Sequence, residues 1–521
     1  MKQYFVGLAL LGLASPLFAQ SEADALRYSR LQFGGTARTQ AIGGANVAVG
    51  ADLNSLSSNP AGLGLYQRSE FTFSPGLGIG NANAQVTNAQ GAPSLSDGRN
   101  SVHVANAGLA FVNRRPDSDN NDWRGGTLAF GFTRINDFNA SFRYRSNVAD
   151  NRSLFQRFRE PRAGAGQSLG DVYDDVDQQF ADNQYATLDG LAYGAYLVNY
   201  DRTANGNYVV STPSDLRRSV VRQEETVLNT GSQTQFDVGY GGSYRDKLYV
   251  GGALGIVSTR FNSVRELREV DEVGGSRSFG SLLLRNELET RGSGFNVRLG
   301  VIYRPLGWLR VGASAQSPTA FQLDDTDETS LDVQFKQPIR VDGQNISSVS
   351  VATEPDLGRY SYRLSTPWRL NTGAAAIIGK YGFVSADVEM VDYGQARLRS
   401  DTSLEYGFNY SFGPENDAIR NDYQRTFNVR VGGEARLDAF RLRLGYANYG
   451  DPYRRSDFDR TQQFFTGGVG LRQKNLSLDL AGVYSLADRY YSPYTLSDSS
   501  QPVVQVEGNR LSTTLTLGLQ F

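Results

Sequence analysis

The chain of 521 residues contains no cysteine and a single histidine. The absence of cysteine excludes disulfides and thiolate metal sites. Apart from the first residues, no stretch reaches the roughly 18 apolar residues that a transmembrane helix needs. A formal net charge of -2 shows no excess of positive charge of the kind that nucleic-acid binding needs. Glycine and aromatic residues are abundant instead, with 57 Gly, 28 Tyr and 28 Phe, a composition compatible with membrane strands whose two faces differ.

The last residues of the chain form an uninterrupted alternating pattern. One face carries Leu511, Thr513, Leu515, Leu517, Leu519 and Phe521, and the other carries Ser512, Thr514, Thr516, Gly518 and Gln520. An isolated terminal strand would expose its edge and its apolar face, unless it closes a barrel that sits in lipid. The terminal aromatic residue also resembles the signal by which the barrel assembly machinery, an expected partner, recognises outer-membrane barrels.

The first residues predict a secretory signal peptide over residues 1–19. Lys2 supplies the positive start, residues 6–13 form a short apolar run, and cleavage is expected after Ala19. Together with the C-terminal strand, this indicates the cell outer membrane of a Gram-negative bacterium.

Alternation and turn residues predict an all-β, transmembrane antiparallel barrel over residues 67–521. Short turns are expected at 244–247, 304–307, 379–382, 437–439 and 472–475. Long extracellular loops are expected at 148–230 (the largest), 263–291, 318–360, 395–424, 450–460 and 486–508. Trp308, Trp368 and Tyr381 fall at strand ends, where an aromatic girdle belongs.

The number of strands depends on an interruption at Arg134, Asn136 and Asp137. The apolar residues before it (Leu128, Phe130, Phe132) and after it (Phe138, Ala140, Phe142, Tyr144) keep the same parity. A hairpin at Asn136-Asp137 would give fifteen strands and place the N-terminus on the wrong side. One long third strand with a kink or bulge gives about fourteen strands, an even number, and is preferred.

Residues 20–66 lack alternation and are rich in Gly, Ala, Ser and Asn, so they fit a compact segment inside the barrel lumen. This segment contains Gly43-Gly44-Ala45 and later Asn59-Pro60-Ala61-Gly62-Leu63. The pattern resembles the N-terminal hatch of the FadL/TodX (OMPP1) family of outer-membrane transport proteins. Further stretches similar to that family are 297–305, 317–319, 366–369 and 430–434, so the resemblance spans most of the mature chain.

The resemblance implies a monomeric fourteen-stranded barrel closed by the hatch, with a kinked third strand. It also implies passive uptake of hydrophobic compounds, either long-chain fatty acids or aromatic hydrocarbons, without a cofactor. Asn59, Pro60 and Ala61 would be hatch residues. For the kink we hypothesise a lateral opening with Asn59 and Pro60 beside it, and the alternative is a bulge with a purely geometric role. That opening would release the hydrophobic small-molecule substrate into outer-membrane lipid, beneath the lipopolysaccharide.

The 148–230 loop offers a capture site for such a substrate. Leu169, Val172, Tyr173, Val176 and Phe180 recur at spacings of three and four, as on one apolar helix face. With Phe155 and Phe158 this face could form a groove for acyl or aryl groups. The alternative is a helix that only packs the loop onto the barrel rim.

Other functions have weaker support. A barrel lipid hydrolase would need a nucleophile and a base, and Ser101 and His103 share a strand face, but no orienting acid is identifiable. No catalytic residue is therefore assigned. A hard cation could be attracted by the acidic patch of Asp324, Asp325, Asp327 and Glu328, but a solvated loop is favoured because the spacing of these residues does not match an EF-hand. No metal ligand is assigned either. A general porin or an adhesin with a binding loop remains the alternative, and it would need no hatch.

Overall fold

The computed structural model describes residues 22–521, apart from 117, 162–166, 273 and 456. The predicted signal peptide therefore lies outside the described residues. Among the described residues, no helix is both long enough and apolar enough to cross a membrane.

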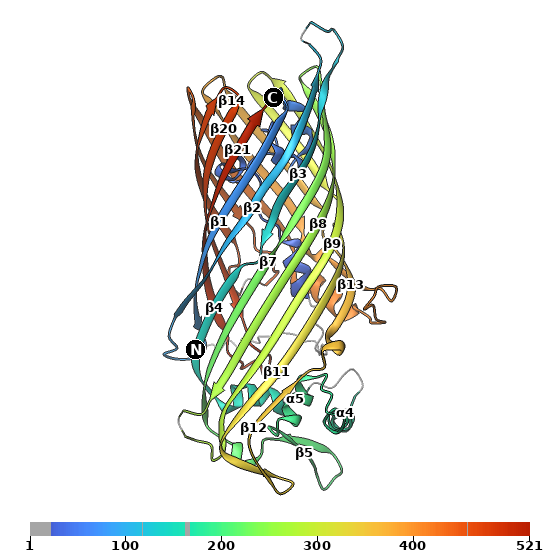
Figure 1. The fold of residues 1–521 in the computed structure, drawn as a ribbon, viewed down its shortest axis with the longest axis vertical. Coiled ribbons are helices and arrows are strands. Elements are labelled where there is room, and N and C mark those ends of the chain that lie inside the picture. Colours follow the sequence, from blue (N-terminus) through green and yellow to red (C-terminus); the bar gives the residue numbers. More distant parts are fainter. Residues whose placement is uncertain (1–21, 117, 162–166, 273, 456) are drawn as a thin grey trace, which may run out of the picture.

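The chain forms a closed antiparallel barrel of fourteen strands, as predicted (Figure 1). Four of the fourteen consist of two consecutive segments each. In chain order the strand segments of the wall are β1 (Glu70–Val86), β2 (Leu95–Arg114), β3 (Trp123–Asp137) with β4 (Ala140–Ala149), β7 (Val220–Tyr244), β8 (Leu248–Val270), β9 (Phe279–Leu306), β10 (Leu309–Gln316) with β11 (Ala320–Val341), β13 (Arg359–Ser365) with β14 (Arg369–Ile378), β15 (Gly382–Asp392) with β16 (Arg397–Ser400), β17 (Arg425–Leu437), β18 (Phe440–Tyr449), β19 (Gln462–Gln473), β20 (Leu476–Tyr491) and β21 (Val504–Gln520).

The barrel closes between its first and last strands. β1 pairs with β21 from Glu70↔Gln520 to Val86↔Val504. Both ends of the wall therefore lie at one rim, here called the terminal rim, which is uppermost in Figure 1. The opposite end, here called the loop rim, carries α4 (Leu169–Asp182) and α5 (Leu188–Gly194).

The wall is apolar outside and polar inside, the reverse of a soluble protein. On β9, Phe295 and Leu299 are 64% and 63% exposed, whereas Asn296 and Arg298 between them are 1% and 3% exposed. Trp308 and Tyr381 are exposed at strand ends, as expected for a girdle. Trp368 is also exposed, but it lies between β13 and β14, the two segments of one strand, rather than at a strand end. This distribution matches a wall whose outer surface faces lipid.

All five predicted short turns are confirmed, but several predicted loops are strands. β8 continues to Val270, β9 begins at Phe279, and β11 continues to Val341, where it forms a hairpin with β12 (Gln344–Ala352). The expected loops at 263–291 and 318–360 are therefore wrong in extent. The largest expected loop, 148–230, is also shorter than predicted, because β7 begins at Val220. Beyond the lipid both faces of a strand meet polar surroundings, so the backbone ladder continues after the hydrophobic alternation has ended.

Residues 22–66, which precede β1, lie inside the barrel, where they appear in blue in Figure 1. This N-terminal segment (residues 22–66) contains α1 (Glu22–Ser29), α2 (Ala37–Ala41) and the 3-10 helices η1 (Leu53–Leu56) and η2 (Pro60–Leu65). Most of its side chains are buried. The remaining elements are η3 (Asp150–Arg152), α3 (Leu154–Arg159), the hairpin β5 (Asn199–Arg202) with β6 (Tyr208–Ser211), η4 (Ser214–Leu216), η5 (Pro355–Gly358), η6 (Tyr393–Gln395) and α6 (Gly413–Asp422).

Candidate functional site in the lumen and at the loop rim

The predicted hatch residues Asn59, Pro60 and Ala61 pack against a glycine-lined part of the wall. Asn59 Nδ2 donates hydrogen bonds to the carbonyls of Val47 at 2.8 Å and Val301 at 3.1 Å. Its Oδ1 accepts from Ala61 N at 3.2 Å and so caps η2. A Cβ atom on Gly300 would collide with the Asn59 side chain. The glycine therefore allows this part of the N-terminal segment to approach the strands closely.

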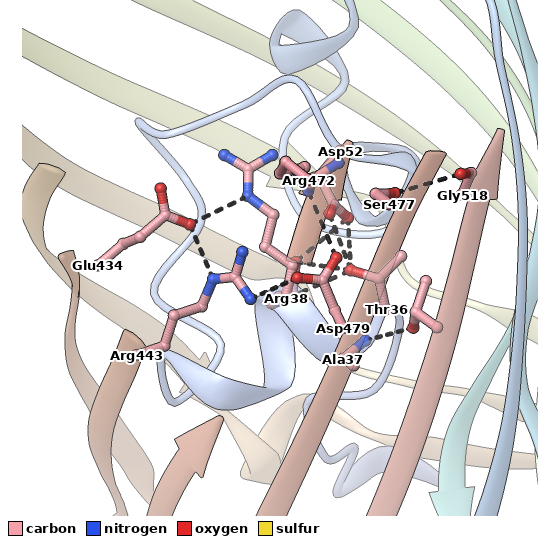
Figure 2. A network of polar contacts seen from close by, with 12 residues as sticks. Thr36, Ala37, Arg38, Asp52, Glu434, Arg443, Arg472, Ser477, Asp479 and Gly518 are labelled. Atoms are coloured by element: carbon pink, nitrogen blue, oxygen red, sulfur yellow. Dashed lines mark hydrogen bonds and ion pairs between the residues drawn. The ribbon is translucent and has the colours of Figure 1, made fainter. Parts of the chain in front are cut away.

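Helix α2 is held by charged groups that project from the wall (Figure 2). Arg443 Nε donates to Glu434 Oε2 at 2.8 Å, and Arg443 Nη1 donates to Asp479 Oδ1 at 2.7 Å. Arg38 of α2 approaches Glu434 to 4.0 Å, and Ala37 N donates to Thr516 Oγ1 at 2.8 Å. Because Arg443 and both carboxylates are almost fully buried, removing one partner would leave an uncompensated charge.

The predicted interruption in the third strand is confirmed. β3 and β4 both pair antiparallel with β7, and the register shifts between Arg134 and Asn136. The two segments are therefore one interrupted strand rather than a hairpin. On the other side, β2 pairs with β3 only as far as Asn106↔Thr133.

Past the kink the wall loses backbone pairing on one side. Within the described part of the chain, no strand pairing joins β2 to β4, although β2 continues to Leu95 alongside β1. Side chains bridge the two strands nearer the loop rim, where Ser141 Oγ donates to Asp97 at 2.6 Å and Arg143 Nε donates to Ser96 O at 3.3 Å. The unpaired stretch is thus bounded at both ends, as a window in the wall would be.

The kink is contacted by residues 27–34 of the N-terminal segment. Gln32 N donates to Ile135 O at 3.0 Å, and Asn136 Nδ2 donates to Arg30 O at 3.1 Å. A Cβ atom on Gly34 would collide with the Arg134 carbonyl. The expectation that Asn59 and Pro60 lie beside the kink is wrong, because they pack against the β7–β9 part of the wall instead.

Arg510 of β21 reaches the kink along the inner face of the wall, over the neighbouring strands β1 and β2. Its Nη2 donates to Asp137 Oδ2 at 2.7 Å and to Ser101 Oγ at 2.6 Å, and its Nη1 donates to Asn139 O at 2.8 Å. The guanidinium lies directly above Gly78 of β1, where any Cβ atom would collide with it. Asp137 also pairs with Arg134 at 3.2 Å. We call these contacts of Arg510 the Arg510 clasp. The local sequence does not predict them, because Arg510 and Asp137 lie on strands far apart in the chain.

A cavity of about 340 Å³ lies on the inner side of the kink. Phe138 and Phe261 line it, with ring centroids 5.5 Å apart in an edge-to-face arrangement, and Leu26 of α1 adds an aliphatic wall. Arg489 and Arg510 bring positive charge to the same cavity. Such a mixture suits a ligand with an apolar body and a polar or anionic group.

Phe155 and Phe158 of α3 belong to the packed core beneath the loop rim. They are 0% and 1% exposed, and their rings lie 6.0 Å apart. Phe155 also meets Phe279 of β9 at 5.0 Å. These two residues therefore tie the largest loop to the wall and present no free surface.

Helix α4 lies over other aromatic residues at the loop rim. Val172 and Val176 are buried, Leu169 and Tyr173 are half-buried, and Phe180 is 37% exposed. The Tyr173 ring stacks on Tyr208 at 4.9 Å, and Phe180 meets Tyr193 at 5.6 Å. The sequence analysis did not predict that these tyrosines lie beside α4. The spacing of three and four residues between Tyr193, Tyr196 and Tyr200 was the available indication of an aromatic cluster.

The candidate catalytic and cation-binding residues are arranged differently from an active site. Ser101 Oγ is bonded to Arg510, as described above, and His103 Nδ1 has no hydrogen-bond partner among the described residues. The acidic patch lies on strand β11 rather than on the expected solvated loop, and Asp325 and Asp327 are buried. Within the described ranges, no group of three or more His, Asp or Glu side chains could hold a metal ion.

The barrel shares its fold with a solved structure. A Pseudomonas aeruginosa FadL homologue aligns with a TM-score of 0.51 at 11% identity, covering 94% of this chain and 99% of that chain. The Ralstonia pickettii toluene transporter TbuX aligns with a TM-score of 0.48 at 17% identity, covering 94% and 98% of the two chains. The Pseudomonas putida toluene transporter TodX aligns with a TM-score of 0.46 at 14% identity, covering 94% and 99%. No protein-family model and no curated protein sequence matches the chain.

Proposed function

We propose that this protein is an outer-membrane channel for passive uptake of hydrophobic compounds, either long-chain fatty acids or aromatic hydrocarbons. The observation that carries the proposal is the unpaired stretch between β2 and β4, which adjoins a partly apolar cavity inside the barrel. An apolar solute gains little from a water-filled pore, so a side exit into lipid gives it a favourable path. The fold shared with the FadL homologue is consistent with this reading.

In the proposed route, substrate is first captured at the loop rim. The exposed ring of Phe180 and the half-buried Tyr173 offer aromatic surface there, next to the tyrosines of α5 and the β5–β6 hairpin. Phe155 and Phe158 support this surface from below. Substrate then enters the cavity beside Phe138 and leaves through the window at the kink.

The N-terminal segment acts as a hatch in this proposal. It contacts the kink through Gln32 and Asn136, and it is anchored to the wall through Arg38 and Asn59. The terminal rim then faces the periplasm and the loop rim faces outward, through the lipopolysaccharide. We propose that the barrel works as a monomer and is inserted by the barrel assembly machinery.

The proposal is tested by filling the cavity at the kink. Ala140 lines the cavity, and Ala140→Phe would add a ring where substrate should pass. Ala386 lies exposed on the outer wall, so Ala386→Phe is a matched control. Uptake of labelled oleate and of toluene is measured in cells that lack other such channels.

We expect Ala140→Phe to reduce uptake of at least one of the two compounds strongly, and Ala386→Phe to leave uptake unchanged. Equal uptake by both variants and the unmodified protein would contradict the route. Size-limited passage of small sugars, with no uptake of either compound, would identify a general porin instead.

A further inference from the structure

A second cavity, of about 360 Å³, lies at the terminal rim, far from the kink. It is lined by residues next to the turns that end β17 and β19, by the start of β1 and by the end of β21. On its inner side lie Arg38 of α2 and Leu65 of η2. The cavity therefore lies between the N-terminal segment and the terminal rim.

The charged groups that line this rim cavity have a small positive excess. Five arginines line it, and Arg443 joins them through its bonds to Glu434 and Asp479. The acidic residues that line it are four in number. The guanidinium groups are Arg38, Arg68, Arg436, Arg441, Arg443 and Arg472, and the carboxylates are Asp52, Glu70, Glu434 and Asp479.

The carboxylates are already engaged by protein groups. Glu434 accepts from Arg436 at 2.9 Å and from Arg443, and Asp479 accepts from Arg443 and lies 3.4 Å from Arg472. Asp52 accepts from Thr36 and Thr39, and Glu70 accepts from Gln520. Arg441 Nη1 donates to the backbone carbonyls of Asp438 and Phe440, both at 2.7 Å, so these bonds do not engage a carboxylate. The positive excess is thus not neutralised within the cavity.

Two buried hydroxyl groups line the same cavity without a partner among the described residues. Tyr66 is 4% exposed and Thr72 is 2% exposed, and both the Tyr66 OH and the Thr72 Oγ1 lack a hydrogen bond. A buried hydroxyl without a partner is costly, whereas an oxyanion could accept a hydrogen bond from each. Hydroxyl donors beside arginines are the groups that bind carboxylate and phosphate.

We propose that the rim cavity is a binding site for an oxyanion, a carboxylate or a phosphate group, that enters from the terminal rim. Arg472 and Arg441 attract the anion, and the hydroxyls of Tyr66 and Thr72 donate hydrogen bonds to its oxygens. The site is separate from the cavity at the kink and extends the proposed function. A carboxylate could belong to a fatty acid that has passed the N-terminal segment or to a free anion at the rim.

The first test is a calorimetric titration of the full-length protein, in a non-ionic detergent and low-chloride buffer, with inorganic phosphate and with acetate. Tyr66→Phe and Thr72→Val each remove only an unpartnered hydroxyl, so folding should be preserved. Loss of one hydrogen bond to a charged group should weaken binding by about tenfold. Tyr240→Phe, on the exposed outer wall, is the matched control and should bind as the unmodified protein does.

Saturable binding of phosphate or acetate that is weakened in both variants supports the site. Competition of decanoate against bound phosphate then separates the two sources. Stronger competition by decanoate than by acetate identifies a fatty acid as the occupant, and equal competition identifies a free anion. No saturable binding of either anion, or equal binding by the double variant Tyr66→Phe/Thr72→Val, would overturn the proposal whatever the outcome of the uptake assay.

Discussion

Replacement of Arg510 by Met should release the kink between β3 and β4. The change removes the hydrogen bonds to Asp137, Ser101 and Asn139 while keeping a long aliphatic side chain. Breaking a fully buried ion pair costs about 3–5 kcal/mol, and an exposed pair contributes less than about 1 kcal/mol. The Arg510 and Asp137 side chains are 16% and 13% exposed, so we expect a local cost of about 2 kcal/mol.

Hydrogen exchange of the purified barrel measures this cost directly. Backbone amides of residues 134–142 should exchange about thirtyfold faster in Arg510→Met, because 1.4 kcal/mol corresponds to a factor of ten. Arg260→Met removes an arginine from an exposed pair with Glu289 on the outer wall and is the control. Uptake should fall as well, since an unclasped strand can pair further with β2 and narrow the window. Unchanged exchange at the kink in Arg510→Met would refute the clasp.

Three further changes test other parts of the structure. Arg443→Met should lower the stability of the docked N-terminal segment by about 3 kcal/mol and admit protease to residues 22–66, whereas equal protection would show that α2 is held by other contacts. Ser168→Ala should destabilise α4 by about 1 kcal/mol through loss of its N-cap. In the unmodified protein, hydrogen bonds from Ser168 lower the pKa of the Asp171 carboxyl. Their contribution to helix stability is therefore present above the unfolded pKa of Asp171 and is lost as pH falls through its folded pKa. Hydrogen exchange of α4 that does not respond to acid would contradict this. Phe180→Ala should reduce uptake without changing the free energy of unfolding, because this ring is exposed. Phe155→Ala should lower the free energy of unfolding by about 3–5 kcal/mol, because this ring is fully buried. The reverse pattern would rule out capture at α4.

The membrane-spanning part of the wall could be predicted because lipid imposes a period of two on each strand. Phe295, Val297 and Leu299 show it clearly. One interrupted third strand was predicted correctly, but the expectation that the apolar phase continues across Arg134 is wrong. The register shift at the kink reverses the two faces, so Leu128 is exposed on the outer wall whereas Phe142 and Tyr144 are buried. Outside the lipid that constraint ends. The continuation of β11 to Val341 therefore could not be predicted from an alternation of apolar and polar residues.

The contacts at the kink could not be predicted, because they join distant parts of the chain. Arg510 reaches Asp137 only after β1 and β21 have closed the barrel, and Gln32 reaches Ile135 from the lumen. A polar residue that faces the lumen looks the same in sequence whether or not it clasps another strand. Phe155 and Phe158 illustrate the same limit, since their burial depends on Phe279 of a remote strand.

The position of the N-terminal segment constrains the order in which the barrel can assemble. The segment bonds to β21 through Ala37, to β9 through Asn59 and to β3 through Gln32, and only a few residues separate its end from Glu70 at the start of β1. If β1 paired with β21 first, the segment would have to enter an already closed cylinder from the terminal rim and form all of these contacts within a confined lumen. The seam should therefore close around a segment that is already seated, so that the first part of the chain to emerge serves as the template on which the last strand docks.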